Sequence, residues 1–294
     1  MSAIVDQAAG HAGETGQQPP ARVRRRRSAS LSIGAVLVGI VVVVAVVSFF
    51  WLPYAPSDTA GGRLEHPDAA HWLGTDKLGR DLLSQLMVGA RIALAVGVGS
   101  VAIGALIGIT LGLLAAFATT WLDDTISAAL DILIAFPTLL LAMLIVAAQG
   151  ASLGTAILAI GLAMSAVVAR LTRVLAKRVL SMQYVTAART SGTSWLGIVG
   201  KHILPNIWPT LSVNLALQFG VAVLAEASLS YLGLGAPPPN ASWGRLLQEA
   251  QGTVATAPVG AIAPGVALVV LVIGVNLVAD GLRDVADPTR RRSR

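Results

Sequence analysis

The chain alternates between long apolar runs and shorter polar connections. Six apolar runs, each about 20 residues long, match the length that a helix needs to cross the hydrocarbon core of a bilayer. Valine-rich stretches such as residues 41–44 favour strands in a water-soluble protein, but in lipid only a helix satisfies all of its own backbone groups. The pattern predicts an all-α polytopic membrane protein with six transmembrane helices, at residues 32–52, 92–117, 126–148, 155–171, 207–229 and 257–279.

The composition supports a membrane protein and excludes several other classes. Of the 294 residues, 55% are hydrophobic and only 12% are charged, whereas a soluble domain carries about 25% charged residues. The chain has no cysteine, which excludes disulfides, thiol catalysis and cysteine metal sites. The net charge of +6 comes from basic residues that flank apolar runs, so we expect membrane lipid and no nucleic acid as a partner. The first apolar run is too long for the core of a cleavable signal peptide.

The basic residues are concentrated on alternate connections. If the N-terminus is cytoplasmic, sixteen of the 21 Lys and Arg residues lie in the two tails and in the connection at 170–206. Because positive charge is retained on the cytoplasmic side, both termini and this connection are expected there. The predicted organisation is a disordered basic cytoplasmic tail (1–30), a first transmembrane helix (31–52), an extracytoplasmic loop and surface segment (53–91), a five-helix core (92–284) and a basic cytoplasmic tail (285–294).

The connection at 170–206 holds the largest internal cluster of charge. A short helix is expected around Ala188, with Gly192 as its left-handed cap, and Thr193 or Ser194 is expected to start a second short helix that runs to about His202. Pro205 and Pro209 are expected to mark the point at which the chain re-enters the membrane. A short surface helix of this kind can fit a groove on a soluble partner. The alternative is a solvated loop held by anionic lipid head groups.

The second apolar run carries Gly104, Gly108 and Gly112, spaced four apart. This spacing places the three glycines on one helix face, where another helix can approach closely.

A polar stripe is expected on the fifth apolar run. Asn214 and Gln218 are four residues apart, and Glu226 lies two further turns along nearly the same face. The stripe is our candidate for the lining of a translocation path, and hydrogen bonding between helices is the alternative. For Glu226 a second alternative is an ion pair with an outer arginine, namely Arg80, Arg91 or Arg245.

The chain lacks the residue patterns of an enzyme. No Gly-x4-Gly-Lys-Ser/Thr phosphate loop occurs, so we expect ATP and Mg²⁺ to be bound by separate subunits and no cofactor to be bound by this chain. His66 and His71 have a poor spacing for a metal, and we expect no metal site and no catalytic residue. A proton-coupled transporter acting alone is a further alternative, but it needs more intramembrane acids than Asp131 and Glu226 and usually an internal repeat.

Five segments of the sequence match known motifs. Thr186-Ala-Ala-x3-Gly192, followed by Leu204-Pro205, resembles the signature loop of bacterial ABC importer permeases, in which Glu is usual where Thr186 stands. Residues 73–91, Phe136-Pro137, residues 229–244 and residues 276–288 resemble the dipeptide/oligopeptide/nickel branch of that family, and the whole is similar to its dipeptide C-type subunit. The resemblance implies a type I ABC importer permease fold whose cytoplasmic coupling helix contacts an ATPase through Tyr184, Thr186, Ala187, Ala188, Arg189, Gly192, Leu204 and Pro205.

The resemblance also implies the assembly. The expected partners are two ABC ATPase subunits, a second homologous permease subunit that forms a heterodimer with this chain, and an extracytoplasmic substrate-binding protein. The expected location is the bacterial cytoplasmic (inner) membrane. The implied function is import of short peptides by alternating access, and the alternatives within the same branch are nickel complexes, glutathione or haem.

Overall fold

The computed structural model describes residues 29–59, 61–237 and 241–286. The basic residues predicted in the two tails therefore lie almost entirely outside the described residues. Within the described ranges the chain is helical, with no strand and one isolated bridge between Thr75 and Asp81. The elements are α1 (Ala29–Phe50), α2 (Leu82–Phe117), α3 (Thr120–Ala135), α4 (Thr138–Gln149), α5 (Leu153–Leu180), α6 (Gln183–Thr190), α7 (Trp195–Ile198), η1 (Val199–Ile203), α8 (Leu204–Tyr231), α9 (Trp243–Ala250) and α10 (Val259–Ala286).

The number of membrane-spanning helices agrees with the prediction, with one change. Five helical segments in the described part of the chain are long and apolar enough to cross a membrane, and α3 with α4 makes a sixth only if the bent pair is one span. The two helices meet at 89°, so the single straight helix predicted at 126–148 is wrong. Pro137 has no N–H to donate, and it forces Phe136 into an extended conformation (φ −80°, ψ 131°), which ends α3.

Three other helix boundaries differ from the prediction. Helix α2 begins at Leu82, because the Asp81 side chain accepts the Ser84 N–H, and it does not begin near Ile92. Helix α5 continues to Leu180, so the first third of the predicted 170–206 connection is helical. Helix α8 begins at Leu204 and follows η1 without a break. Pro209 therefore lies inside α8 and does not mark its start.

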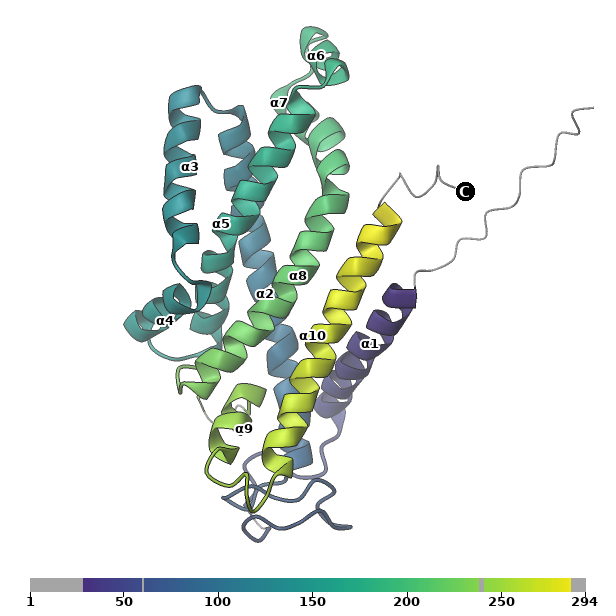
Figure 1. The fold of residues 1–294 in the computed structure, drawn as a ribbon, viewed down its shortest axis with the longest axis vertical. Helices are drawn as coiled ribbons and strands as arrows, with labels where there is room; N and C mark the ends of the chain where they lie inside the picture. Colours follow the sequence, from purple (N-terminus) through teal and green to yellow (C-terminus); the bar gives the residue numbers. More distant parts are fainter. Residues whose placement is uncertain (1–28, 60, 238–240, 287–294) are drawn as a thin grey trace, which may run out of the picture.

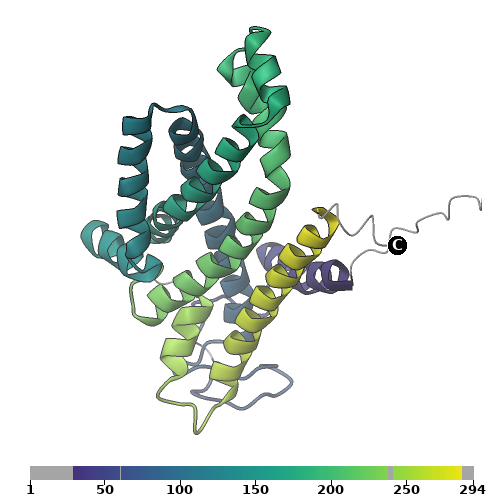
Figure 2. The ribbon, with the colours of Figure 1, turned by 45° about the horizontal axis from the view of Figure 1, so that its top comes forward.

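The helices form an elongated bundle with two different ends (Figure 1). Helix α2 packs most extensively against α5, and α1 packs against α10, while α8 contacts α2, α5 and α10. At one end α6 and α7 project beyond the ends of α5 and α8; at the other, residues 51–81 and α9 lie together (Figures 1 and 2). We call residues 181–203 the tip, and residues 51–81 together with α9 the loop layer.

The glycine face predicted on α2 is confirmed as a site of close helix approach. A methyl group added at Gly108 would lie 2.6 Å from Val168 Cβ, and one added at Gly112 would lie 2.5 Å from the Ala169 carbonyl oxygen, both on α5. A second close contact, between α1 and α10, was not predicted. There a methyl group on Gly34 would lie 2.6 Å from the Gly274 carbonyl oxygen. Small residues thus let both helix pairs pack backbone to backbone.

Candidate functional site

The tip is built from two short helices joined by a glycine turn. Gly192 has a φ of +83°, and the N–H groups of Gly192 and Thr193 donate to the carbonyls of Arg189 and Ala188 at 3.0 and 3.1 Å. This is a Schellman ending for α6. Ser194 then accepts the Gly197 N–H and starts α7. The predicted cap and the predicted start of the second helix are therefore confirmed.

The predicted end of that second helix near His202 is wrong, because the chain continues through the π turn η1 into α8. In this turn the Leu204 N–H donates to the Val199 carbonyl, five residues earlier. Pro205 explains the wider turn: it has no N–H, and its ring clashes with the carbonyl four residues before it. Leu204 and Pro205 are thus the first residues of α8.

The tip is anchored to the helical bundle by a small apolar core. Val185 of α6 is fully buried and Ile198 of α7 is 2% exposed. Both belong to one cluster with residues of α5 and α8, among them Val179 and Ile207. The tip is therefore packed directly against the ends of α5 and α8.

The outer face of the tip exposes apolar side chains to solvent. Leu196 is 64% exposed and Trp195 is 53% exposed, next to half-exposed Tyr184 and Met182. Of the predicted contact residues, Ala188 and Leu204 are half-buried, and the exposed ones are Tyr184, Thr186, Ala187, Arg189, Gly192 and Pro205. Exposed apolar side chains that gather on one element are typical of a protein-binding site.

A few polar and aromatic contacts join the tip to neighbouring helices. The Asn206 side-chain amide donates to the Tyr184 hydroxyl at 3.2 Å and to the His202 carbonyl at 2.6 Å. The Arg189 guanidinium lies 5.9 Å from the centre of the Phe117 ring of α2, at the weak end of a cation–π contact. Phe117 also packs edge to face on Trp195.

Part of the basic charge that the sequence predicted near the tip belongs to α5 and is paired with α3. Arg173 and Lys177 belong to α5 and bind Asp123 of α3, and Arg170 pairs with Asp131 at 3.2 Å. The charge cluster predicted on the 170–206 connection is therefore not all free on its surface, because these three residues pair with acids of α3. The sequence signal for this was the acidic Asp123-Asp124 pair, which the positive-inside rule does not weigh. In the described part of the chain, Arg178, Arg189 and Lys201 form no ion pair.

The predicted path residues lie along α8 but not as one stripe. Glu226 is 3% exposed, and its carboxylate accepts the Ser230 hydroxyl at 2.6 Å. The predicted arginine pair is wrong. Arg91 donates to Ser48, whereas Arg80 and Arg245 both bind Glu249.

Asn214 and Gln218 are half-buried. The buried Asn214 side-chain oxygen has no hydrogen-bond partner among the described residues. These two residues lie at the middle of α8 and stay predicted path residues. Glu226 lies nearer the end of α8, buried and bonded to Ser230, and its place in the path also stays a prediction.

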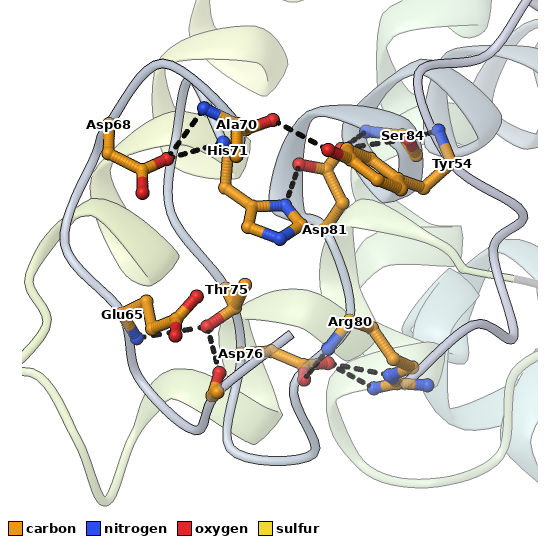
Figure 3. Close-up of polar contacts among 11 residues, drawn as sticks. Tyr54, Glu65, Asp68, Ala70, His71, Thr75, Asp76, Arg80, Asp81 and Ser84 are labelled. Carbon is orange, nitrogen blue, oxygen red and sulfur yellow. Dashed lines mark hydrogen bonds and ion pairs between the residues drawn. The ribbon is translucent and has the colours of Figure 1, made fainter. Parts of the chain in front are cut away.

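The loop layer is a dense polar network at the start of α2 (Figure 3). The Asp81 carboxylate accepts the backbone N–H and hydroxyl of Ser84 at 2.7 and 2.8 Å, and lies 3.1 Å from His71 Nδ1. The His71 ring packs on Tyr54, with the ring centres 4.6 Å apart. His71 therefore fixes the loop to the cap of α2. Among the described residues no cluster of three acidic or histidine side chains can hold a metal.

A second part of this network ties residues 76–85 to α9. Asp76 accepts the Leu78 and Arg80 N–H groups at 2.8 and 2.9 Å, and its other oxygen binds the Arg80 guanidinium at 2.6 Å. Arg80 continues to Glu249 of α9 at 2.6 Å. The last part of the loop and surface segment predicted at 53–91 is thus a folded turn followed by the first turns of α2.

Comparison with known proteins places this architecture in a family. The model of the binding-protein-dependent transport system inner membrane component family matches residues 104–292. The glutathione transport system permease protein GsiD of Pectobacterium atrosepticum is 40% identical over 86% of this chain and 86% of its own. The dipeptide transport system permease protein DppC of Alkalihalophilus pseudofirmus is 36% identical over 87% of this chain and 84% of its own.

Among solved structures, a chain of the MetNI methionine ABC transporter in an inward-facing conformation has the same fold. Its TM-score is 0.58 at 22% sequence identity, over 69% of this chain and 96% of that chain. The predicted type I ABC importer permease fold is therefore confirmed. Because the family model covers most of the chain and the permeases align over nearly all of it, this protein belongs to the inner membrane components of binding-protein-dependent transport systems, as the permease component of an ABC importer.

Proposed function

We propose that this chain forms one half of the passage in an ATP-driven importer of short peptides. The observation that carries the proposal is the tip, which has an exposed apolar face and packs on the ends of two long helices. Two basic residues of the tip, Arg189 and Lys201, form no ion pair among the described residues. Two ABC ATPase subunits bind ATP and Mg²⁺, and one of them docks on this face. A second, homologous permease subunit forms a heterodimer with this chain and completes the passage.

In this mechanism the tip acts as a lever. When the ATPases close on ATP, they move α6 and α7, and the buried Val185 and Ile198 pass the movement to α5 and α8. Helix α8 carries Asn214 and Gln218, so the movement changes which side of the membrane these residues face. Alternating access follows because the packed helices shift between discrete arrangements.

We assign the tip end to the cytoplasm of a bacterium and the loop layer to the outer side of its inner membrane. The support is the charge distribution: the tip end carries the basic residues Arg178, Arg189 and Lys201, and positive charge is retained inside. Both termini are cytoplasmic in this topology. The loop layer then faces the extracytoplasmic substrate-binding protein, which releases its solute at this end.

The names of the relatives support a short peptide as the solute. Two of them are named for glutathione and for dipeptide transport, and a third, 39% identical, is named as a putative peptide transport permease of Brucella suis. Glutathione is the second candidate, because the 40% identical relative is named for it. Nickel complexes and haem stay further alternatives within the branch.

The docking role is tested by a charge placed on the exposed face of the tip. Leu196→Glu adds an acid at a side chain that is 64% exposed, so the fold is retained while an apolar contact with the ATPase is lost. Trp72→Glu is the matched control, since Trp72 is also 64% exposed but lies in the loop layer. We expect L196E to lose co-purifying ATPase and W72E to keep it. Equal ATPase retention in both variants would contradict docking at the tip.

The solute is tested with the purified complex in proteoliposomes. Uptake of labelled dipeptide and of labelled glutathione is measured with the binding protein, with and without ATP. Uptake of either compound only with ATP supports the proposal and names the solute. Uptake that continues without the ATPase subunits would favour the proton-coupled alternative.

A further inference from the structure

We infer that Asp123 is a positioning residue that couples α3 to the tip, a role that rests on the ATP-driven function proposed above. Asp123 stands in the first turn of α3 and is 5% exposed. The Arg173 guanidinium binds both carboxylate oxygens, at 2.5 and 2.8 Å, and the Lys177 ammonium binds one of them. We call these three residues the Asp123 clamp.

The clamp lies where α5 leads into the tip. Arg173 and Lys177 are four residues apart, so they lie on one side of the last turns of α5. Ala176 and Val179, in the same turns, belong to the apolar core beneath α6 and α7. The end of α5 therefore holds the tip on one side and α3 on the other. A movement of the tip that turns α5 must also move α3 as long as the clamp is closed.

Other contacts between α3 and the bundle are few. Its apolar contact with α5 and α2 has three buried members, and half-buried Leu111, Ile126 and Ile134 pack around them. The buried members are Leu130, Ala166 and Ala169. The outward face of α3 is open, with Trp121 76% and Ile132 63% exposed. Since this apolar contact is small, the charged clamp contributes much of what fixes α3 relative to α5. Helix α3 is followed by α4 after a sharp bend. The clamp therefore connects the tip to both α3 and α4.

The same helix pair provides a matched control. Asp131 of α3 pairs with Arg170 of α5 at 3.2 Å, but both side chains are nearly 60% exposed. An exposed pair contributes little, because water and salt screen it, whereas a buried carboxylate with two cations cannot be neutralised without leaving unpaired charges. Coupling between the two helices is therefore expected from Asp123 and not from Asp131.

The experiment compares Asp123→Asn with Asp131→Asn in the reconstituted full importer. The readouts are solute imported, ATP hydrolysed and the amount of assembled complex. We expect the assembled D123N complex to hydrolyse ATP at a rate near that of the wild type, while solute imported per ATP falls by about fivefold or more, as for typical coupling between sites. D131N is expected to keep the wild-type ratio.

Two further variants keep the inference testable if D123N does not fold. Lys177→Met opens half of the clamp but leaves Asp123 paired with Arg173, and it is expected to lower the ratio by a smaller factor in a normally assembled complex. A combined Asp123→Arg and Arg173→Asp variant is expected to recover part of the ratio. An unchanged ratio in D123N and K177M, or an equal fall in D131N, would overturn the inference. A wild-type complex without ATP-dependent uptake would instead overturn the proposed function.

Discussion

The two ends of this permease are held together in different ways. In the loop layer, buried carboxylates of Asp76 and Asp81 each accept several hydrogen bonds and tie residues 51–81 to α2 and α9. At the tip the polar contacts lie at the surface, and the anchor is provided by four buried apolar side chains, those of Val185, Ile198, Val199 and Ile203. The difference indicates that buried charge and hydrogen bonds hold the loop layer, whereas apolar packing holds the tip.

The largest effect is expected in the loop layer. Asp76→Ala removes the acceptor of two backbone N–H groups and of the Arg80 guanidinium, and it leaves a largely buried cation with one partner. We expect a loss of about 3 kcal/mol in the free energy of unfolding, measured by titration with SDS in mixed micelles. Asp68→Ala, in an exposed loop, removes bonds to two N–H groups and is expected to cost about 1 kcal/mol. Equal losses would show that burial does not distinguish the two acids.

A smaller effect is expected in the helical bundle that joins the two ends. Gly108→Ala places a methyl group 2.6 Å from Val168 Cβ, whereas Gly39→Ala meets no atom within 4 Å. Overpacking is expected to destabilise G108A by about 1–3 kcal/mol in the same titration. G39A is expected to be neutral or slightly stabilising. A G108A protein as stable as G39A would mean that α2 and α5 can separate at little cost.

At the tip the backbone turn is the sensitive point. Gly192→Ala forces a side chain into φ +83°, at a cost of about 1–2 kcal/mol, although no atom lies within 4 Å. We expect a distorted α6–α7 turn and less co-purifying ATPase, with normal membrane insertion. Gly200→Ala is the control, since Gly200 is helical and equally open. If G192A and G200A retained the ATPase equally, the turn geometry would not matter for docking.

The smallest effect is expected when a single tyrosine hydroxyl group is removed at either end. Tyr184→Phe removes a 3.2 Å bond with Asn206 from an exposed ring at the tip. Tyr54→Phe removes a 3.0 Å bond to the Ala70 carbonyl, which is also exposed, but from a half-buried ring in the loop layer. We expect about 0.5 kcal/mol or less for Y184F and about 1 kcal/mol for Y54F. Limited proteolysis of residues 51–81 provides the second readout, and faster cleavage is expected only in Y54F. A larger loss from Y184F than from Y54F would reverse the comparison.

Local sequence chemistry determined much of the fold. The apolar runs located the membrane helices, because lipid leaves no other way to satisfy the backbone. Gly192 and Ser194 located the turn of the tip, since a left-handed residue and a hydroxyl cap act within a few residues. The spacing of Gly104, Gly108 and Gly112 located a close helix contact, although not its partner. Pro137 was visible in the sequence, but its consequence, the break between α3 and α4, was not predicted.

Tertiary structure alone decided which charged groups meet. Asp123 and Arg173 are fifty residues apart, and Arg80 and Glu249 are 169 apart, so no local pattern connects them. For the same reason Arg170, Arg173 and Lys177 looked like a docking surface, and Glu226 looked like a partner for an arginine. The sequence by itself determined where the chain crosses the bilayer and where its short turns lie, because those depend on neighbouring residues. Which charges are buried and paired was settled only when the packed helices brought distant residues together.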